Sequence, residues 1–242
     1  MKRDISNQEF DAFSKEKKKQ YIAELLIRTS GATPVLSPKP PVAFVMAGLP
    51  GAGKTEFLDT LSELLLGKNF EPFVRIDLDQ IVTIFPQYTP QSYDRFRSQG
   101  NYALARCVDV ARKGNYNMMI DGTFSGVSGA SVANLEKLLE AGYIVAMYYM
   151  HDDALTAWSY TKAREAETRR GITKDGFLRA CQNIQVNLKL AVQKFRNREA
   201  FRLYAVVQKE LRDKNYQILS DPQRIDAVLE KGYNIDKLND ML

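Results

Sequence analysis

The stretch PVAFVMAGLPGAGKTEFLDTLSELLLG, residues 41–67, carries the strongest structural signal in the sequence. Val42 to Ala47 form a short apolar run, which is typical of a strand buried on both faces. Apolar side chains then recur at helical spacing between residues 57 and 65, and Gly67 is placed to end that helix. The stretch therefore predicts a strand, a glycine-rich turn and a helix.

The turn matches the pattern G-x-x-x-x-G-K-[ST] without a mismatch. Glycines let the backbone form a nest whose N–H groups point at phosphate oxygens, and the start of the helix adds partial positive charge. In such a turn Lys54 reaches the β- and γ-phosphates, and the Thr55 hydroxyl binds Mg²⁺. The sequence therefore predicts a nucleoside triphosphate site. Its expected residues are Gly48, Leu49, Pro50, Gly51, Ala52, Gly53, Lys54 and Thr55.

Composition narrows the classes of protein to which the chain can belong. The 242 residues carry a net charge of +5, which suits an anionic ligand such as a nucleotide without demanding a nucleic acid. Cys107 and Cys181 lie far apart in apolar-patterned stretches, so we interpret them as reduced core thiols rather than a disulfide. The single histidine, His151, nearly excludes a Ser-His-Asp hydrolase or a His-rich metal site. A general base is therefore expected to be a carboxylate.

No feature of the sequence indicates a membrane protein. No apolar run approaches the length that spans a bilayer, and the opening segment MKRDISNQEF lacks the apolar core of a signal peptide. The expected location is the cytoplasm, with no membrane partner.

The chain divides into three expected segments. Residues 1–40 combine amphipathic helical patterns with a proline-rich linker; the helices either pack on the edge of the core, which we favour, or present a docking surface to a partner. Strand and helix patterns alternate over residues 41–220. This alternation predicts an α/β fold, a P-loop NTPase-type three-layer sandwich with a mostly parallel sheet flanked by helices. Residues 221–242 are expected to form a helical tail packed on that core.

Two further strand patterns end in acidic residues. Residues 73–76 lead into Asp77 and Asp79; alternation at a strand end would place both carboxylates on one side, where one contacts the metal shell or locks the turn and the other reaches a substrate hydroxyl. Residues 115–120 lead into Asp121, the arrangement in which a carboxylate holds Mg²⁺ directly or through water. Because the carboxyl ends of parallel strands meet at one edge of a sheet, these acids are expected beside the glycine-rich turn.

The remaining patterns complete the expected core. Residues 81–93 are loop-rich and aromatic, and they are placed to shape an acceptor pocket. Residues 102–112 return to helical periodicity. Strands are predicted at 143–150 and 200–207, and residues 215–219 can pair with the second of these as a hairpin.

A helical pattern over residues 154–170 carries Lys162, Arg164, Arg169 and Arg170. Phosphoryl transfer uses arginines from a mobile lid to neutralise the moving phosphate. A solvated basic face, paired with neighbouring glutamates, would explain the same charges. Charge alone does not decide between these two interpretations.

The blocks AGLPGAGKT, RIDLD, MMIDGT, RRGITKD and FRLY, in this order, resemble the zeta toxin family. The resemblance covers roughly residues 41–220. It implies a P-loop kinase of a bacterial toxin–antitoxin system that phosphorylates the sugar of UDP-N-acetylglucosamine or a related UDP-amino sugar. It also implies ATP or GTP as the phosphoryl donor, Mg²⁺ as the cofactor, and a small helical antitoxin that blocks the ATP site.

The resemblance also implies a role for each matched residue. Lys54 and Thr55 match the nucleotide and Mg²⁺ residues, and Asp79 matches the general base that takes the proton from the acceptor hydroxyl. Arg164 and Arg170 match the two arginines that clamp the phosphates. By this resemblance, Lys54, Asp79 and the two arginines are the catalytic residues.

Asp121 stands where family members carry Glu or Asp. We count it with Thr55 as a metal ligand, and with Asp79 and Thr123 as a substrate contact. The carboxylate that grips the sugar in characterised members should lie near Ala105, yet no glutamate occurs between the two acidic strand ends. The kinase activity therefore carries over better than the identity of the sugar.

The function expected from the sequence is an ATP- or GTP-dependent kinase that acts on a hydroxyl of a small molecule. Two alternatives stay open. One is a polynucleotide, nucleoside or dinucleotide kinase that shares this core. The other is a non-catalytic nucleotide-binding regulatory module. A nucleic-acid partner is not expected.

Overall fold

The fold comes from a computed structural model, which describes residues 2–68, 70–168, 171–208 and 216–242. Its strands are β1 (Val42–Gly48), β2 (Val74–Asp77), β3 (Met118–Asp121), β4 (Ile144–His151), β5 (Phe201–Gln208) and β6 (Tyr216–Leu219). They form a six-stranded sheet in the order β2-β3-β1-β4-β5-β6. Neighbours from β2 to β5 run parallel, whereas β6 is antiparallel to β5.

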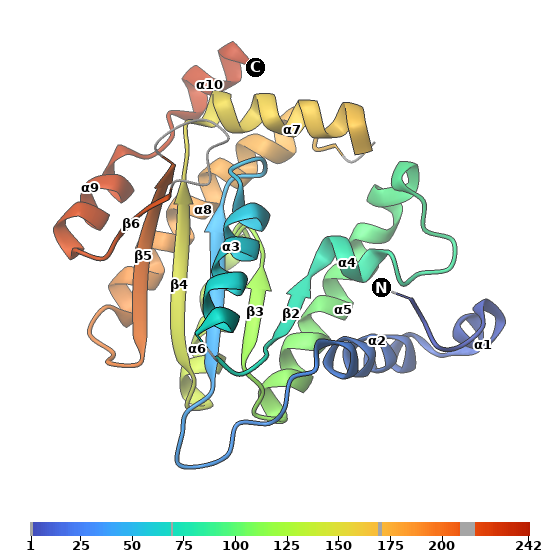
Figure 1. The fold of residues 1–242 in the computed structure, drawn as a ribbon. Helices are drawn as coiled ribbons and strands as arrows, with labels where there is room; N and C mark the ends of the chain where they lie inside the picture. The colour runs from blue at the N-terminus through green and yellow to red at the C-terminus, as the bar shows by residue number, and fades with distance from the viewer. Residues whose placement is uncertain (1, 69, 169–170, 209–215) are drawn as a thin grey trace.

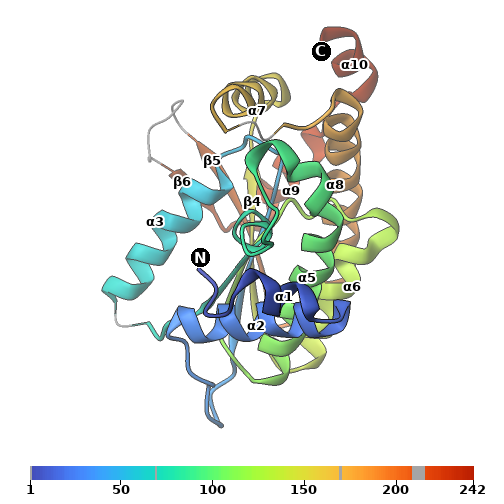
Figure 2. The ribbon, with the colours of Figure 1, turned by 90° about the vertical axis from the view of Figure 1, so that its right-hand side faces the viewer.

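Helices cover both faces of this sheet. In Figure 2 α3 lies on one side, α5, α6 and α8 lie on the other, and α7 crosses above the strand ends. Among the described residues the α-helices are α1 (Asn7–Ala12), α2 (Lys15–Ser30), α3 (Lys54–Gly67), α4 (Leu78–Val82), α5 (Tyr93–Lys113), α6 (Ala130–Glu140), α7 (Ala154–Thr168), α8 (Lys174–Phe195), α9 (Pro222–Lys231) and α10 (Ile235–Met241). The expected three-layer α/β sandwich with a mostly parallel sheet is confirmed (Figure 1).

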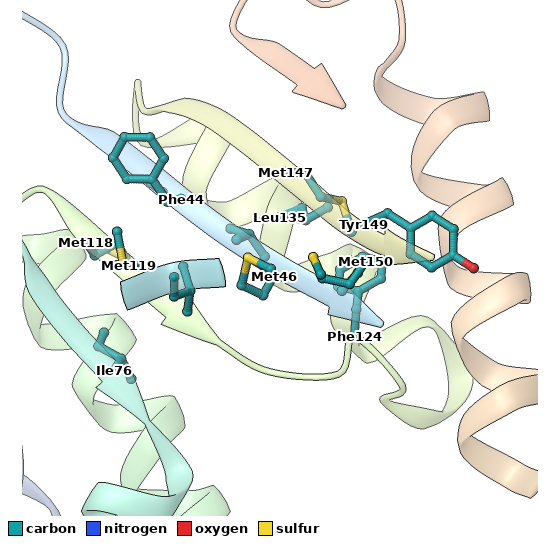
Figure 3. Packing of buried hydrophobic residues seen from close by; sticks show 14 of the residues in the cluster. Phe44, Met46, Ile76, Met118, Met119, Phe124, Leu135, Met147, Tyr149 and Met150 are labelled. Carbon is teal, nitrogen blue, oxygen red and sulfur yellow. The ribbon is translucent and has the colours of Figure 1, made fainter. Parts of the chain in front are cut away.

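The centre of the sheet is apolar on both faces, as the continuous hydrophobic runs predict. Every residue of β1 after Val42 is buried. Figure 3 shows the packing around it, with the labelled side chains Phe44, Met46, Ile76, Met118, Met119, Phe124, Leu135, Met147, Tyr149 and Met150. Close packing leaves little freedom to the strands, so it holds the carboxyl ends of β1, β3 and β4 in place. The predicted nucleotide residues lie at these ends.

Gly48, the last residue of β1, lies against the neighbouring strand β4. It pairs with Met150, and a Cβ atom at Gly48 would lie 2.8 Å from the carbonyl oxygen of Met150. Its φ of +146° is also a conformation that L side chains rarely adopt. Glycine is therefore required where the chain leaves β1 and begins the turn.

Both terminal segments pack on the sheet domain. α2 contacts α5 and the edge strand β2, and Phe10 is fully buried. The favoured interpretation of residues 1–40, helices packed on the edge of the core, is therefore confirmed. α9 and α10 bury apolar side chains in the same cluster. The division into residues 1–40, 41–220 and 221–242 stays a prediction.

Helical structure extends further into residues 81–93 than expected. α4 continues to Val82, and α5 begins at Tyr93 rather than at residue 102. The Ser92 hydroxyl accepts a hydrogen bond from the Thr89 backbone N–H at 2.8 Å and so caps the short 3-10 turn Pro90–Ser92, which leads into α5. The first turns of α5 are polar, so no apolar periodicity marks them in the sequence.

The third strand is shorter than the expected 115–120. It begins at Met118, because Asn115 has a φ of 59° and turns the chain. The Asn117 side chain accepts a hydrogen bond from the backbone N–H of Val42 at 2.8 Å, so this residue ties the start of β1 to the start of β3.

Two expectations from composition can be compared with the structure. Cys107 and Cys181 are buried and free, as expected. Within the described ranges, no helix combines the length and the apolar character needed to cross a bilayer.

Candidate active site

The glycine-rich turn connects β1 to α3 and contacts the helix above it. Gly53, with a φ of 77°, precedes Lys54, the first residue of α3. A Cβ atom at Gly51 would lie 2.1 Å from the carbonyl oxygen of Ala157 and 2.6 Å from Oγ1 of Thr161. Both contacts belong to α7, so the turn and this helix pack directly on each other (Figure 1).

The Lys54 amine is the electrostatic centre of the site. It is buried and donates a hydrogen bond to the Leu49 carbonyl oxygen at 2.7 Å. Burial, together with the positive charge of Arg164, lowers the pKa of Lys54 to about 8. The negative charges of Asp121 and Asp79 oppose this shift. The structure therefore brings the described members of the predicted catalytic set, with Asp121, into one electrostatic cluster.

Thr55 and Asp121 meet beside this amine. The Thr55 hydroxyl donates a hydrogen bond to Oδ2 of Asp121 at 3.0 Å. Burial raises the pKa of Asp121, and the Lys54 charge and the Thr55 hydrogen bond oppose the shift. A hydroxyl and a carboxylate are oxygen donors of the kind that Mg²⁺ prefers, so these two residues fit the expected ion.

The expectation that Asp77 and Asp79 share one side of an extended strand is wrong. Asp77 ends β2 and caps α4, and its carboxylate accepts a hydrogen bond from the Asp79 backbone N–H at 2.9 Å. Asp79 lies in the first turn of α4. An aspartate at a helix N-cap competes well with continued strand, and Asp77 therefore locks the turn, one of the two roles considered for this pair.

Asp77 is itself an unusual carboxylate. It pairs in register with Asp121 across β2 and β3. Burial, together with the charges of Asp121 and Asp79, raises the pKa of Asp77 to about 6. Three carboxyl groups thus gather at the ends of two neighbouring strands, next to the buried lysine.

Tyr93 is a site residue that the motif analysis did not single out. It begins α5, and burial, the charge of Asp79 and a hydrogen bond with Asp79 raise its pKa. Its place at the end of the aromatic stretch 81–93 is the one signal in the sequence that favours it. The contact restrains the carboxylate of Asp79.

Arg164 lies on α7 and faces the turn across a cavity of about 400 Å³. The lining residues are Gly51, Gly53, Lys54, Thr55, Glu56, Tyr160, Ala163, Arg164, Glu167 and Tyr216. Lys162 instead pairs with Glu165 at 2.8 Å on the exposed face of the helix. Lys162 thus belongs to the solvated basic face, whereas the role of Arg164 in neutralising a phosphate stays a prediction. Arg170 lies outside the described residues.

Thr123 follows β3 beneath the turn. Its carbonyl oxygen accepts a hydrogen bond from the Gly48 backbone N–H at 3.2 Å, and its hydroxyl lies 2.6 Å from the Ser125 hydroxyl. Thr123 therefore ties the end of β1 to the segment after Asp121. Its hydroxyl already has a protein partner.

A second cavity, of about 310 Å³, lies between the sheet, α5 and α6. Gly122, the residue after Asp121, lines it together with Phe124 and Ser131. Ala105, where the resemblance leads one to expect a carboxylate, also lines it. Its charged lining residues are Asp109, Arg112 and Lys137.

A parallel sheet, a glycine-rich turn before a helix, and a hydroxyl–carboxylate pair beside a buried lysine define a P-loop protein with a kinase-like fold. A family model of the zeta toxin matches residues 28–220 of the chain. The chain belongs to the zeta toxin family. A search of curated proteins found no match.

Solved structures share this fold at low sequence identity. A chain of the PezAT chromosomal toxin–antitoxin system of Streptococcus pneumoniae is 17% identical, with a TM-score of 0.63 over 96% of this chain and 95% of that chain. The native AvrRxo1-ORF1:-ORF2 complex gives 11% identity and a TM-score of 0.59, over 90% and 78%. The same complex with ATP gives 13% and 0.55, over 88% and 64%.

Proposed function

We propose that this protein is a kinase that transfers the γ-phosphoryl group of ATP or GTP to a hydroxyl of a small molecule. The observation that carries the proposal is the meeting of Thr55 and Asp121 at a hydrogen bond beside the buried Lys54, with Arg164 across the same cavity. The charge of Asp79 also acts on Lys54. An arginine that faces the turn, and a second carboxylate, Asp79, beyond the metal pair, are features that phosphoryl transfer uses. The structure of a related fold with ATP supports a nucleotide donor.

The nucleotide would lie in the cavity between the turn and α7. Backbone N–H groups of residues 48–55 would hold its phosphates, and Lys54 would release the Leu49 carbonyl oxygen to contact them. Thr55 and Asp121 would hold Mg²⁺. The ion supplies positive charge to the β- and γ-phosphate oxygens when it is bound.

Asp79 would act as the general base. Its carboxylate would take the proton of the acceptor hydroxyl, whose oxygen then attacks the γ-phosphorus while the nucleoside diphosphate leaves. Tyr93 would keep the carboxylate in position. Arg164, and Arg170 by the family resemblance, would stabilise the charge of the transferring group; loss of such a group commonly lowers the rate by about two to five orders of magnitude.

The acceptor would be a UDP-amino sugar such as UDP-N-acetylglucosamine. Membership of the zeta toxin family supports this choice, with Asp121 and Thr123 as further contacts. The cavity that begins at Gly122 is placed to receive part of such a molecule, although Ala105 offers it no carboxylate. A small helical antitoxin would be the protein partner, since a chain of a toxin–antitoxin system shares this fold.

A transfer assay with labelled ATP tests the proposal. UDP-amino sugars, nicotinamide dinucleotides, nucleosides and oligonucleotides would be offered in parallel, and labelled UDP-amino sugar is the expected product. Transfer to an oligonucleotide with a steep salt dependence would instead indicate a polynucleotide kinase. Tight ATP binding without transfer to any acceptor would indicate a regulatory module and refute the kinase.

A further inference from the structure

Arg75 is a charged residue in the middle of the edge strand β2, on the side of the sheet that carries the site. Alternate residues of a strand share a face, so Arg75 and Asp77 point the same way. Asp77 pairs in register with Asp121. Asp59 of α3 forms an ion pair with Arg75. The guanidinium therefore lies between α3 and the end of β3.

The same guanidinium reaches the candidate metal site. Its Nη2 atom lies 3.7 Å from Oδ2 of Asp121, which is also the oxygen that accepts the Thr55 hydrogen bond. The side chain of Asp121 is 7% exposed, whereas that of Asp59 is 52% exposed. Water screens the Asp59 contact far more, so the attraction to Asp121 is strong for its distance.

We propose that Arg75 is the counter-cation of the magnesium site: it holds the Asp121 carboxylate while the metal is absent and lowers the affinity of the free protein for a divalent cation. The inference rests on the proposed function, which places the ion at Thr55 and Asp121. A divalent cation beside Asp121 repels the guanidinium, so binding is expected to turn Arg75 away from Asp121 and leave it paired with Asp59 alone.

The surroundings of Arg75 allow this movement. A cavity of about 290 Å³ adjoins it, lined also by Ser62 of α3 and Gln80 of α4. The Nε atom of Arg75 is buried without a hydrogen-bond partner among the described residues, and Nη1 donates a hydrogen bond to Asp59, so the guanidinium can turn away from Asp121 about that bond. Asp59 remains as its partner after withdrawal. The phosphates of a nucleotide would offset the repulsion, and the metal would therefore bind mainly together with the nucleotide.

Binding of Mn²⁺ to the nucleotide-free protein, followed by electron paramagnetic resonance of the free ion, tests the proposal. A neighbouring charge commonly shifts an ionic equilibrium by about one to three powers of ten. Arg75→Met is therefore expected to bind Mn²⁺ about tenfold more tightly than the parent. Asp59→Asn removes the alternative partner, keeps Arg75 on Asp121 and is expected to weaken Mn²⁺ binding. A residue that only braces the fold would not produce opposite shifts.

Arg196→Met is the matched control, because it removes an ion pair with Asp226 that lies between α8 and α9. It should leave Mn²⁺ affinity unchanged. Failure of Arg75→Met to bind Mn²⁺ more tightly than the parent, including failure of both to bind, overturns the proposal. If Arg75→Met does not fold, Asp59→Asn decides instead. Unchanged or tighter Mn²⁺ binding by Asp59→Asn then also overturns the proposal. Mn²⁺ binding without phosphoryl transfer to any acceptor would refute the proposed kinase alone.

Discussion

At the scale of single residues, burial sets the chemistry of the candidate site. It lowers the pKa of Lys54 to about 8 and raises that of Asp77 to about 6. Both groups therefore change charge close to neutral pH, whereas an unperturbed lysine or aspartate side chain would not. Bound phosphate would act against the shift of Lys54, because an adjacent anion favours the charged amine.

Nucleotide binding at about pH 8.5 is expected to take up a proton at Lys54. A free-state pKa of about 8 leaves much of the amine neutral there, and the phosphates raise it toward or above the ordinary value. Affinity should therefore fall as the pH rises above 8, and Lys54 itself is expected to take up no proton at about pH 6, where its amine is charged in both states. Calorimetry in buffers of different ionisation enthalpy measures the uptake. Equal heats in every buffer at the higher pH would contradict it.

Asp79→Asn should abolish most phosphoryl transfer and leave ATP affinity within a few-fold. The amide keeps the shape of the side chain but cannot take the proton of the substrate hydroxyl. General-base catalysis commonly raises the rate by about two to four orders of magnitude. Turnover and binding of a non-hydrolysable ATP analogue separate the two effects. Asp236→Asn is the matched control, since Asp236 also lies in the first turn of a helix, α10. Near-normal turnover of Asp79→Asn would remove this residue from the mechanism.

At the scale of elements, the contact between the glycine-rich turn and α7 couples the proposed nucleotide site to the helix that carries Arg164. Gly51→Ala is expected to push α7 away, because its φ of +82° disfavours a side chain and the new Cβ atom would meet backbone of Ala157. The free energy of unfolding should fall by roughly 2 kcal/mol or more, and affinity for an ATP analogue should fall about tenfold or more.

Urea unfolding and calorimetry check both effects of Gly51→Ala. Gly67→Ala at the end of α3 is the control, because a Cβ atom there meets nothing within 4 Å. The control should leave ATP-analogue affinity unchanged and stability equal or slightly higher, since alanine favours helix over glycine. Equal behaviour of the two variants would show that α7 does not depend on the turn.

Which elements the sequence could predict depends on the kind of signal each one carries. β1 and β4 are nearly continuous apolar runs, so their existence and their order along the chain follow from the hydrophobic pattern. The start of α5 does not, because residues near Tyr93 are mostly polar and the helix continues directly from the short 3-10 turn Pro90–Ser92. Asp79 was expected on a strand but lies on a helix. The Asp77 side chain caps the N-terminus of α4, and this cap ends the strand before Asp79. Arg75 carries no motif, and only the fold brings it to Asp121.

At the scale of the whole molecule, one hydrophobic core takes in residues from both ends of the chain. Phe10 is buried against Tyr21 of α2 and Phe85, and the C-terminal helices contribute Ile225, Val228, Leu229 and Leu238. The family model ends at residue 220, before these helices begin. The core of the kinase-like fold thus extends beyond the stretch that the motifs define.

Removal of residues 221–242 is therefore expected to unfold the protein or nearly so. Each of the four buried side chains contributes about 1.5–3 kcal/mol, and their sum approaches the whole net stability of a domain, about 5–15 kcal/mol. Circular dichroism and urea titration of residues 1–220 measure the loss, with Gln223→Ala in the full chain as a control at an exposed position of α9. Cooperative unfolding of the shortened chain at the parent's urea midpoint would mean that the sheet domain is stable without α9 and α10. The burial of these four side chains would then add nothing to the free energy of unfolding of the sheet and the helices packed on it.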